Sequence, residues 1–430
     1  PKGQTTCAEI QRILRSKGQC SAAHKSCFST CVYKDAKKEF LESLESITNY
    51  SYFFAETTYA KQLRPRRTII LEEAHNLELD LSKFIELEFS EKFAKNTLGL
   101  VTGNPLKTQK QIFSWVRDAY KPALQALINK LQADLEKTGD DAELLKLAFQ
   151  HERLDKHVCK VNRFLSAYEE DNWIVNVDVD IGKFRKYQFK TIDVSEYAQD
   201  HLYAHGQYFL FLSATLMDRD AYCETVGLKP EDVEFLDIDT PFPVENRPIF
   251  FVPAGSMAAN SKQASLPNLA NVVKELLDQH VGEKGIIHCV TYDIAEFLKK
   301  NVKNKRLLFH SSLDRDFVFQ KHVTSTTDTV IVSPSMTEGV DLQNDLSRFQ
   351  IICKVPFPYL GCRATKKRMK KRKHWYAYQT AKTVVQAVGR SVRNAEDHAV
   401  TYIIDADWLR FYSNNSNLFS PGFKSTIQNF

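Results

Sequence analysis

Residues 68–76 read TIILEEAHN, an apolar run that stops at two adjacent carboxylates, Glu72 and Glu73, followed by Ala-His. Such a run predicts a buried strand, and open α/β sheets bind their ligands at the carboxyl ends of their strands. At a nucleoside triphosphate site, one carboxylate can hold Mg²⁺ and the other can orient the attacking water. Short acidic runs also occur at solvated strand-to-helix turns, so this stretch does not decide the chemistry alone.

Three later segments give the first stretch its context. They read LSATL at 212–216, EGVD at 338–341 and QAVGRSVR at 386–393. In this order the four segments resemble motifs II, III, V and VI of superfamily 2 helicases, and their residues are most similar to those of the XPD/DinG group of iron-sulfur helicases. The resemblance runs from the first cysteines to the last helix, so it covers nearly the whole chain.

The resemblance implies an α/β fold of two RecA-like parallel-sheet lobes with an iron-sulfur insert and a mostly helical arch insertion. The expected domains are the cluster insert at 1–45, lobe 1 at 46–78 and 190–240, the arch at 79–189 and lobe 2 at 241–430. It further implies a monomeric ATP-dependent DNA helicase, powered by hydrolysis between the lobes, that moves 5′ to 3′ on single-stranded or forked DNA. The implied cofactors are ATP, Mg²⁺ and a [4Fe-4S] cluster, and the implied setting is DNA repair.

The bulk composition fits a globular protein of two or three domains. The chain has 430 residues, 43% of them hydrophobic and 26% charged, with a formal net charge of +5. No apolar stretch approaches the roughly 20 residues of a membrane span, so no membrane partner is expected. The mild positive charge permits a polyanionic partner. Nine cysteines, an odd count in a long chain, argue against a disulfide framework and for a reducing intracellular compartment.

The hydrophobic pattern predicts the order of the elements. Strands are expected at 46–50 and 67–71, and long amphipathic runs then predict a mostly helical stretch to residue 170. Strands at 173–179, 187–192 and 208–212 lead to a proline-marked linker at 241–248. Beyond the linker, strands and helices alternate, which predicts a parallel sheet covered by helices. The elements expected there are strands 249–252, 285–290, 329–332, 349–355 and 400–404 and helices 268–279, 294–301 and 374–393.

By the resemblance, the polar residues of the first segment have separate roles. Glu73 would polarise the attacking water, and Glu72 would hold Mg²⁺ through its water shell. His75 would link the site to Ser213 and Thr215 by hydrogen bonds. The family ordinarily has Asp where this chain has Glu72, and the longer side chain shifts the carboxylate by about one bond length, enough to slow hydrolysis or move the metal.

The last segment supplies cations and an amide. Arg390 and Arg393 lie three apart on a predicted helix and so share a face, from which they can neutralise charge on a phosphoryl group. Gln386, one turn earlier, can contact phosphate or water, and Gly389 would allow close approach. Lone arginines more commonly pair with surface acids, and that alternative stays open. By the resemblance, the loop that senses nucleotide and nucleic acid contains Gly339 and Asp341.

Four cysteines near the start have the spacing of a metal centre. Cys7, Cys20, Cys27 and Cys31 follow the pattern C-x12-C-x6-C-x3-C. Four thiolates can bind Zn²⁺ or an iron-sulfur cube, but structural zinc sites usually use closely spaced cysteine pairs. Because the segment around Cys31 resembles the fourth-cysteine segment of XPD/DinG proteins, an iron-sulfur cluster is favoured over zinc. Either centre is favoured over four free thiols, since a loop without a core needs a cross-link.

A basic run precedes the last predicted site helix. It consists of Lys366, Lys367, Arg368, Lys370, Lys371, Arg372 and Lys373, with Trp375 and Tyr376 close behind. Such a run attracts phosphates and the aromatic rings could stack on a base, which predicts DNA binding. A solvated helix start and a nuclear localisation signal would give the same composition, and both alternatives stay open.

The phosphate-binding loop of P-loop enzymes, Gly-x-x-x-x-Gly-Lys-Ser/Thr, does not occur in the sequence. Helicases of the resembled group carry this loop upstream of the cysteines. We therefore expect the chain to be a fragment that starts inside the cluster insert and is inactive as an ATPase by itself. The alternative function is a catalytically weakened, nucleic-acid-binding scaffold of the same fold, which Glu72 favours.

Overall fold

The computed structural model describes residues 32–101, 103–180, 182–238, 240–336 and 340–428. The described chain forms two compact units. The first contains the residues up to Leu212 together with Thr225–Gly227, and the second contains Ser213–Glu224 and the chain from Leu228 onward. Within the described ranges, no helix combines the length and the apolar character needed to cross a bilayer.

The second unit is built on a six-stranded sheet in which neighbouring strands are parallel. The strand order is β6-β11-β10-β7-β9-β8. The central strands are buried on both faces, so their sequences are nearly continuous apolar runs such as GIIH in β7 and FQII in β10. The strands are β6 (Ile249–Phe251), β7 (Gly285–His288), β8 (Leu307–Phe309), β9 (Val330–Ser333), β10 (Phe349–Ile352) and β11 (Val400–Ile403).

Helices alternate with these strands, which confirms the predicted α/β class. Leu269 and Val273 of α12 share one buried core with Ile287 of β7 and Ile351 of β10. Two of the expected helices correspond to α12 and α13, whereas β8 and α14 were not predicted because their apolar runs are short. The helices from residue 219 onward are α11 (Arg219–Val226), α12 (Lys262–Gln279), α13 (Tyr292–Asn301), α14 (Arg315–Thr324), α15 (Arg363–Lys371), α16 (Trp375–Val388), α17 (Asp407–Asn415) and α18 (Pro421–Lys424).

The first unit contains a pair of parallel strands, β1 (Arg66–Glu72) and β5 (Gly206–Leu212), both of which were predicted. The predicted strand at 46–50 is wrong, because α4 (Tyr50–Ala55) begins there. The side chain of Asn49 accepts the backbone N–H of Tyr52 at 2.8 Å and so caps this helix. The unit also contains α3 (Val32–Glu42), a π-helical turn (Glu56–Ala60), α5 (Leu77–Ile85) and α10 (Ser195–His201).

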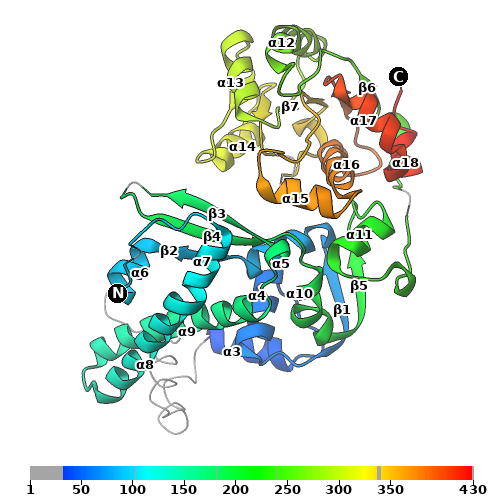
Figure 1. Cartoon of the computed structure of the whole chain (residues 1–430). Helices are drawn as coiled ribbons and strands as arrows, with labels where there is room; N and C mark the ends of the chain where they lie inside the picture. The colour runs from blue at the N-terminus through cyan, green and yellow to red at the C-terminus, as the bar shows by residue number, and fades with distance from the viewer. Residues whose placement is uncertain (1–31, 102, 181, 239, 337–339, 429–430) are drawn as a thin grey trace. The chain divides into compact units, whose positions relative to one another are not determined.

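Between α5 and α10, the chain forms a mostly helical region (Figure 1). This region has its own hydrophobic core. Phe89, Tyr120, Trp173 and Phe189 belong to that core. A small antiparallel sheet of order β2-β4-β3 packs into it, and β2 was not predicted because its four residues, LEFS, are too few to show a period. The elements are β2 (Leu87–Ser90), α6 (Glu91–Leu98), α7 (Gln109–Trp115), α8 (Lys121–Lys137), α9 (Asp141–Ser166), β3 (Trp173–Val179) and β4 (Arg185–Thr191).

Candidate functional site

Glu72 and Glu73 lie where β1 ends. Glu72 is the last residue of the strand, and Glu73 has left-handed backbone angles, φ 49° and ψ 41°. Such angles strain a residue such as glutamate, whereas glycine and asparagine adopt them more readily, and strained residues are concentrated at functional sites. Both residues are exposed, so their carboxylate oxygens are free to reach a ligand. Exposed oxygen donors of this kind fit the coordination that Mg²⁺ prefers.

Two neighbouring side chains support this pair. Nδ1 of His75 lies 3.3 Å from Oε2 of Glu73, and the side chain of His75 is only 6% exposed whereas that of Glu73 is 70% exposed. The hydroxyl of Tyr50 donates a 2.8 Å hydrogen bond to the carbonyl oxygen of Glu72. Burial, followed by the negative charges of Asp80, Glu73 and Glu72, raises the pKa of Tyr50 well above its ordinary value. The hydroxyl therefore keeps its proton and remains a donor.

Thr215 and Leu216 contact α16 within the second unit, and Ser213 contacts Thr215. Oγ of Ser213 accepts the backbone N–H of Thr215 at 3.1 Å, and Nε2 of Gln386 donates to Oγ1 of Thr215 at 3.4 Å. The hydroxyl of Tyr378, also on α16, donates to the carbonyl oxygen of Leu216 at 2.9 Å. Oε1 of Gln386 is buried and accepts no hydrogen bond from the described residues. Three predicted site residues are thus in contact, and one of them keeps an unused acceptor.

Arg390 and Arg393 do not lie on a helix. α16 ends one residue before Gly389, its C-cap, so the prediction that both arginines share a helical face is wrong. They lie in the following loop and contact the predicted sensing segment. Nη1 of Arg390 donates to the carbonyl oxygen of Val340 at 3.3 Å, and Nε of Arg393 lies 3.2 Å from Oδ1 of Asp341. The structure therefore brings residues of the two last motif-like segments together by a route different from the predicted one.

Asp397 joins the same two loops, although sequence reasoning missed it. Its side chain is fully buried, and Oδ2 accepts the backbone N–H groups of Asn344 at 2.9 Å and of Arg393 at 3.3 Å. Oδ1 lies 2.8 Å from Nη1 of Arg348 and accepts the backbone N–H of His398 at 2.9 Å. In the sequence, Asp397 is an acid in a polar stretch before a strand, and the same pattern marks an ordinary solvated turn.

The basic run forms α15 and the turn after it. Arg372 is an exception among its cations, because it is only 3% exposed. Trp375 is 7% exposed, and the guanidinium of Arg368 lies 5.7 Å from the centre of its ring, so Trp375 is packed rather than available for stacking on a base. The exposed cations of the run are Lys366, Lys370, Lys371 and Lys373. Tyr359, shortly before α15, is 80% exposed and was not predicted as a candidate.

Five predicted site residues lie outside the described residues, namely Cys7, Cys20, Cys27, Cys31 and Gly339. The iron-sulfur centre and the role of Gly339 therefore stay predictions. In the ranges that the structure describes, no three His, Cys, Asp or Glu side chains form a group that could hold a metal ion. The isolated spacing of the five later cysteines predicts that all are core residues, and Cys223, Cys289 and Cys353 are indeed buried. The prediction is wrong for Cys159 and Cys362, which are only partly buried.

Several known proteins that are similar to this chain are helicases. Residues 282–420 match the helicase C-terminal domain family. The ATP-dependent DNA helicase YoaA of Escherichia coli (strain K12) is 25% identical over 209 residues, covering 46% of this chain and 32% of that protein. A probable ATP-dependent helicase of Methanocaldococcus jannaschii is 26% identical over 228 residues, covering 46% of this chain and 34% of that protein. The chain thus spans about a third of the length of these curated relatives.

Solved structures match over a larger part of the chain. A structure described as an XPD helicase has a TM-score of 0.58 at 14% identity, and the match covers 100% of this chain and 80% of that chain. The structure of Xpd4 of S. tokodaii has a TM-score of 0.52 at 12% identity, and the match covers 89% and 81%. At these identities the likeness shows the fold, which is the α/β arrangement described above.

Proposed function

Because this chain belongs to the XPD/DinG family of superfamily 2 helicases, we propose that it forms the motor part of an ATP-dependent DNA helicase. The observation that carries the proposal is the contact network of the second unit. There the side chain of Gln386 donates a hydrogen bond to Thr215, 171 positions away in the sequence, and Arg393 forms an ion pair with Asp341. A hydroxyl, an amide and guanidinium groups collected in this way supply the contacts that phosphoryl transfer requires.

In this proposal, the residues after β1 carry out the hydrolytic step. Glu73 orients the attacking water and accepts its proton, and His75, 3.3 Å away, fixes the direction of the Glu73 carboxylate. Glu72 would hold Mg²⁺ through its water shell. Bound Mg²⁺ would neutralise charge on the β- and γ-phosphates.

Arg390 and Arg393 stabilise the charge on the transferring phosphoryl group. Arg393 has a partner that can be displaced, because the Arg393 and Asp341 side chains are 39% and 59% exposed. An ion pair this exposed contributes less than about 1 kcal/mol, so a nucleotide phosphate can compete with Asp341 for the guanidinium. Asp341 is then released when ATP binds, which links the nucleotide to the loop that contains it.

The finer proposals follow the same resemblance. Translocation runs 5′ to 3′ on single-stranded DNA, the cations of α15 contact its phosphates, and Cys7, Cys20, Cys27 and Cys31 hold a [4Fe-4S] cluster. The domain boundaries are those given by the sequence. For the cluster, broad visible absorbance that is lost in Cys20→Ser supports iron, whereas stoichiometric zinc in a colourless anaerobic preparation contradicts it.

A catalytically weakened scaffold is the second candidate, and one observation favours it. Glu72 stands where the family ordinarily has Asp, and Mg²⁺ tolerates little change in geometry. A scaffold would still bind single-stranded DNA, but it would not turn over ATP faster when DNA is added.

The experiment that separates the two candidates is a steady-state ATPase assay on the protein as its gene encodes it, with and without single-stranded DNA. The motor proposal expects DNA-stimulated turnover, and Glu73→Gln should lower kcat by about a hundredfold or more because the general base is lost. Glu88→Gln, an exposed glutamate on β2, is the matched control and should change nothing. Absence of stimulation in the wild-type protein establishes the scaffold instead, and unwinding of 5′-tailed against 3′-tailed duplexes tests the direction.

A further inference from the structure

The loop that joins β10 to α15 presents an aromatic ring to solvent. It spans residues 353–362 and leaves the carboxyl end of an interior strand of the parallel sheet, the edge at which open α/β sheets bind their ligands. Tyr359, near the end of this loop, is 80% exposed. Single exposed apolar residues are ordinary on protein surfaces, so a role depends on how the ring is held and on what lies beside it.

The loop is fixed on both sides of Tyr359. Before it, the ring of Phe357 stacks on that of Tyr376 in α16, with centres 5.9 Å apart and planes 8° apart. The same ring meets Phe411 of α17 edge-on, with centres 5.5 Å apart. After it, the backbone N–H of Cys362 donates to the carbonyl oxygen of Tyr359 at 3.2 Å and closes a four-residue turn. The backbone around the ring is therefore ordered before any ligand binds.

Gly361 provides the surface against which the ring lies. The hydroxyl end of the Tyr359 ring occupies the space where a Cβ would lie on Gly361, so an alanine there would overlap it. Glycine is the residue that permits such a close approach to the backbone. Because the ring contacts the backbone on this side and is otherwise exposed, it is held in one place while most of its surface stays uncovered.

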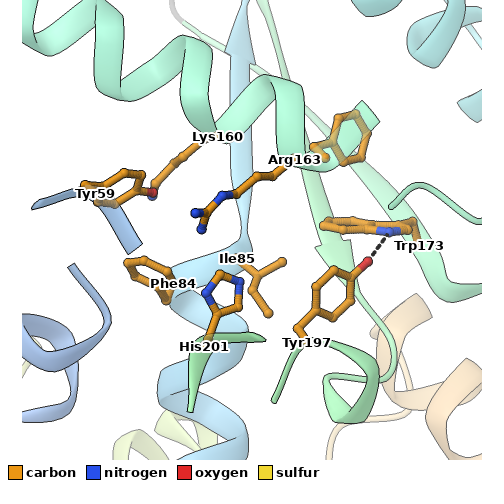
Figure 2. Close-up of a pocket in the computed structure, with 9 residues that line it drawn as sticks. Tyr59, Phe84, Ile85, Lys160, Arg163, Trp173, Tyr197 and His201 are labelled. Atoms are coloured by element: carbon orange, nitrogen blue, oxygen red, sulfur yellow. Dashed lines mark hydrogen bonds between the residues drawn. The ribbon is translucent and has the colours of Figure 1, made fainter. Parts of the chain in front are cut away.

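Other aromatic rings of this chain are covered by the protein's own cations. Figure 2 shows one case, a recess of the first unit in which Lys160 and Arg163 lie among aromatic side chains. Nζ of Lys160 lies 5.5 Å from the ring centre of Phe84, and the guanidinium of Arg163 lies 5.9 Å from that of Tyr59. Among the residues that the structure describes, no cation covers Tyr359 in this way, so its ring is available to a ligand.

Three cations continue from the ring along one face of α15. Arg363, Lys366 and Lys370 are exposed and lie three and then four positions apart, the spacing that places side chains on one face of a helix. From the first to the last of them, the helix rises about 10 Å. That length corresponds to about three nucleotides at a rise of roughly 3.4 Å each. No carboxylate within the described ranges pairs with these three cations, so they can bind phosphates.

We propose that Tyr359 stacks on one base of a single nucleic-acid strand whose phosphates contact Arg363, Lys366 and Lys370. Cations alone would bind any polyanion, and a ring alone would bind any apolar group, but a ring followed by a row of cations matches a strand of bases and phosphates. A duplex fits less well, because its bases are stacked and paired inside the helix. The inference rests on the proposed helicase function for the identity of the strand, and it names the residue that contacts a base.

The experiment is equilibrium binding of single-stranded DNA, without nucleotide, to the protein as its gene encodes it. The probes are a fluorescein-labelled thymidine 15-mer and a labelled 15-mer of abasic residues, which keeps the phosphates and lacks the bases. Tyr359→Leu should weaken binding of the thymidine 15-mer about tenfold, because stacking on a base is lost, and should leave binding of the abasic 15-mer unchanged. Tyr359→Phe keeps the ring and should bind both probes like the wild-type protein.

Gly361→Ala tests the same contact without changing the ring. Its Cβ should displace the exposed ring and leave the core undisturbed, so binding of the thymidine 15-mer should weaken. In a protein that already carries Tyr359→Leu, the same change should have no further effect, because both changes remove one interaction.

The salt dependence separates the ring from the cations. Arg363→Gln should reduce the slope of the logarithm of affinity against the logarithm of salt concentration by about one counterion, because a phosphate contact is lost. Tyr359→Leu should lower the affinity at every salt concentration and leave this slope unchanged, because no charge is removed.

Three results would overturn the proposal. The first is wild-type affinity for the thymidine 15-mer in Tyr359→Leu with near-native circular dichroism. The second is an equal loss of affinity in Tyr359→Phe or for the abasic 15-mer, because the contact is then not stacking on a base. The third is displacement of the thymidine 15-mer by polyglutamate as effective as by unlabelled DNA, which assigns the surface to an acidic protein segment. DNA-stimulated ATPase activity of the wild-type protein tests the helicase proposal separately, so either proposal can fail without the other.

Discussion

Replacing Asp397 with asparagine should damage the loop that holds Arg393. The carboxylate of Asp397 is fully buried and accepts N–H groups from Asn344 at 2.9 Å and Arg393 at 3.3 Å, while it pairs with Arg348 at 2.8 Å. An asparagine keeps the shape, but its NH₂ group cannot accept a hydrogen bond, and the charge opposite Arg348 disappears. At least one backbone N–H is then left buried without a partner.

The expected loss of stability follows from these contacts. Removing one partner of a buried ion pair costs about 3–5 kcal/mol, because the other charge stays buried without compensation. Here the value should lie near the lower end, about 3 kcal/mol, because Arg348 keeps a second partner in Asp345 at 2.7 Å. A chemical denaturation series measures this change, and a parallel ATPase assay should show a lower kcat, because Arg393 loses its backbone anchor.

Asp345 provides the matched control. It contacts the same guanidinium of Arg348, but its side chain is 95% exposed. Asp345→Asn should therefore cost less than about 1 kcal/mol and leave turnover unchanged. If Asp397→Asn behaves like Asp345→Asn in both assays, the idea that one buried carboxylate holds the two loops together is wrong.

Three further changes test other parts of the structure. Burial lowers the pKa of His288 to about 4 from 6.5, so the unfolded chain takes up the proton first. The free energy of unfolding should therefore be highest above pH 6.5 and fall by about 3 kcal/mol as the pH is lowered toward 4. In His288→Asn, the urea concentration at the unfolding midpoint should depend less on pH across this range. If α15 contacts phosphates, the double variant Lys366→Gln with Lys370→Gln should release about two fewer counterions on binding DNA, measured as a smaller slope of the logarithm of affinity against the logarithm of salt concentration. Lys274→Gln, which changes an exposed lysine elsewhere, should leave this slope unchanged. Gly285→Ala would bring Cβ to 2.6 Å from the aromatic ring on the neighbouring strand, and a thermal melt should show the loss of about 1–3 kcal/mol expected from overpacking.

The strands of the second unit could be predicted because their environment is uniform. Residues 285–288 and 349–352 are buried on both faces, so almost every position selects for an apolar side chain, and the run is visible without knowledge of its neighbours. The prediction of a strand at 46–50 failed for the opposite reason. Its few apolar residues suit a strand or a helix equally well, and the Asn49 cap decides between them.

The candidate residues could be recognised by type, but the way they are held could not. The end of α16 before Gly389 removes Arg390 and Arg393 from the helix, and a periodic pattern does not reveal where a helix stops to within one turn. The burial of Arg372 inside a run of cations, and the role of Asp397, depend on partners distant in the sequence. Residue type indicates what a side chain can do, whereas its partners depend on tertiary structure.

The backbone of Glu73 has a consequence for the evolution of this protein. A left-handed conformation costs a residue other than glycine or asparagine about 1–2 kcal/mol, so either of those amino acids would relax the turn. Selection for heat resistance alone would therefore favour replacing this glutamate early, and the more durable protein would lose the group assigned to water activation. Glutamate at this position is expected to persist only in lineages where turnover, rather than persistence of the fold, determines survival.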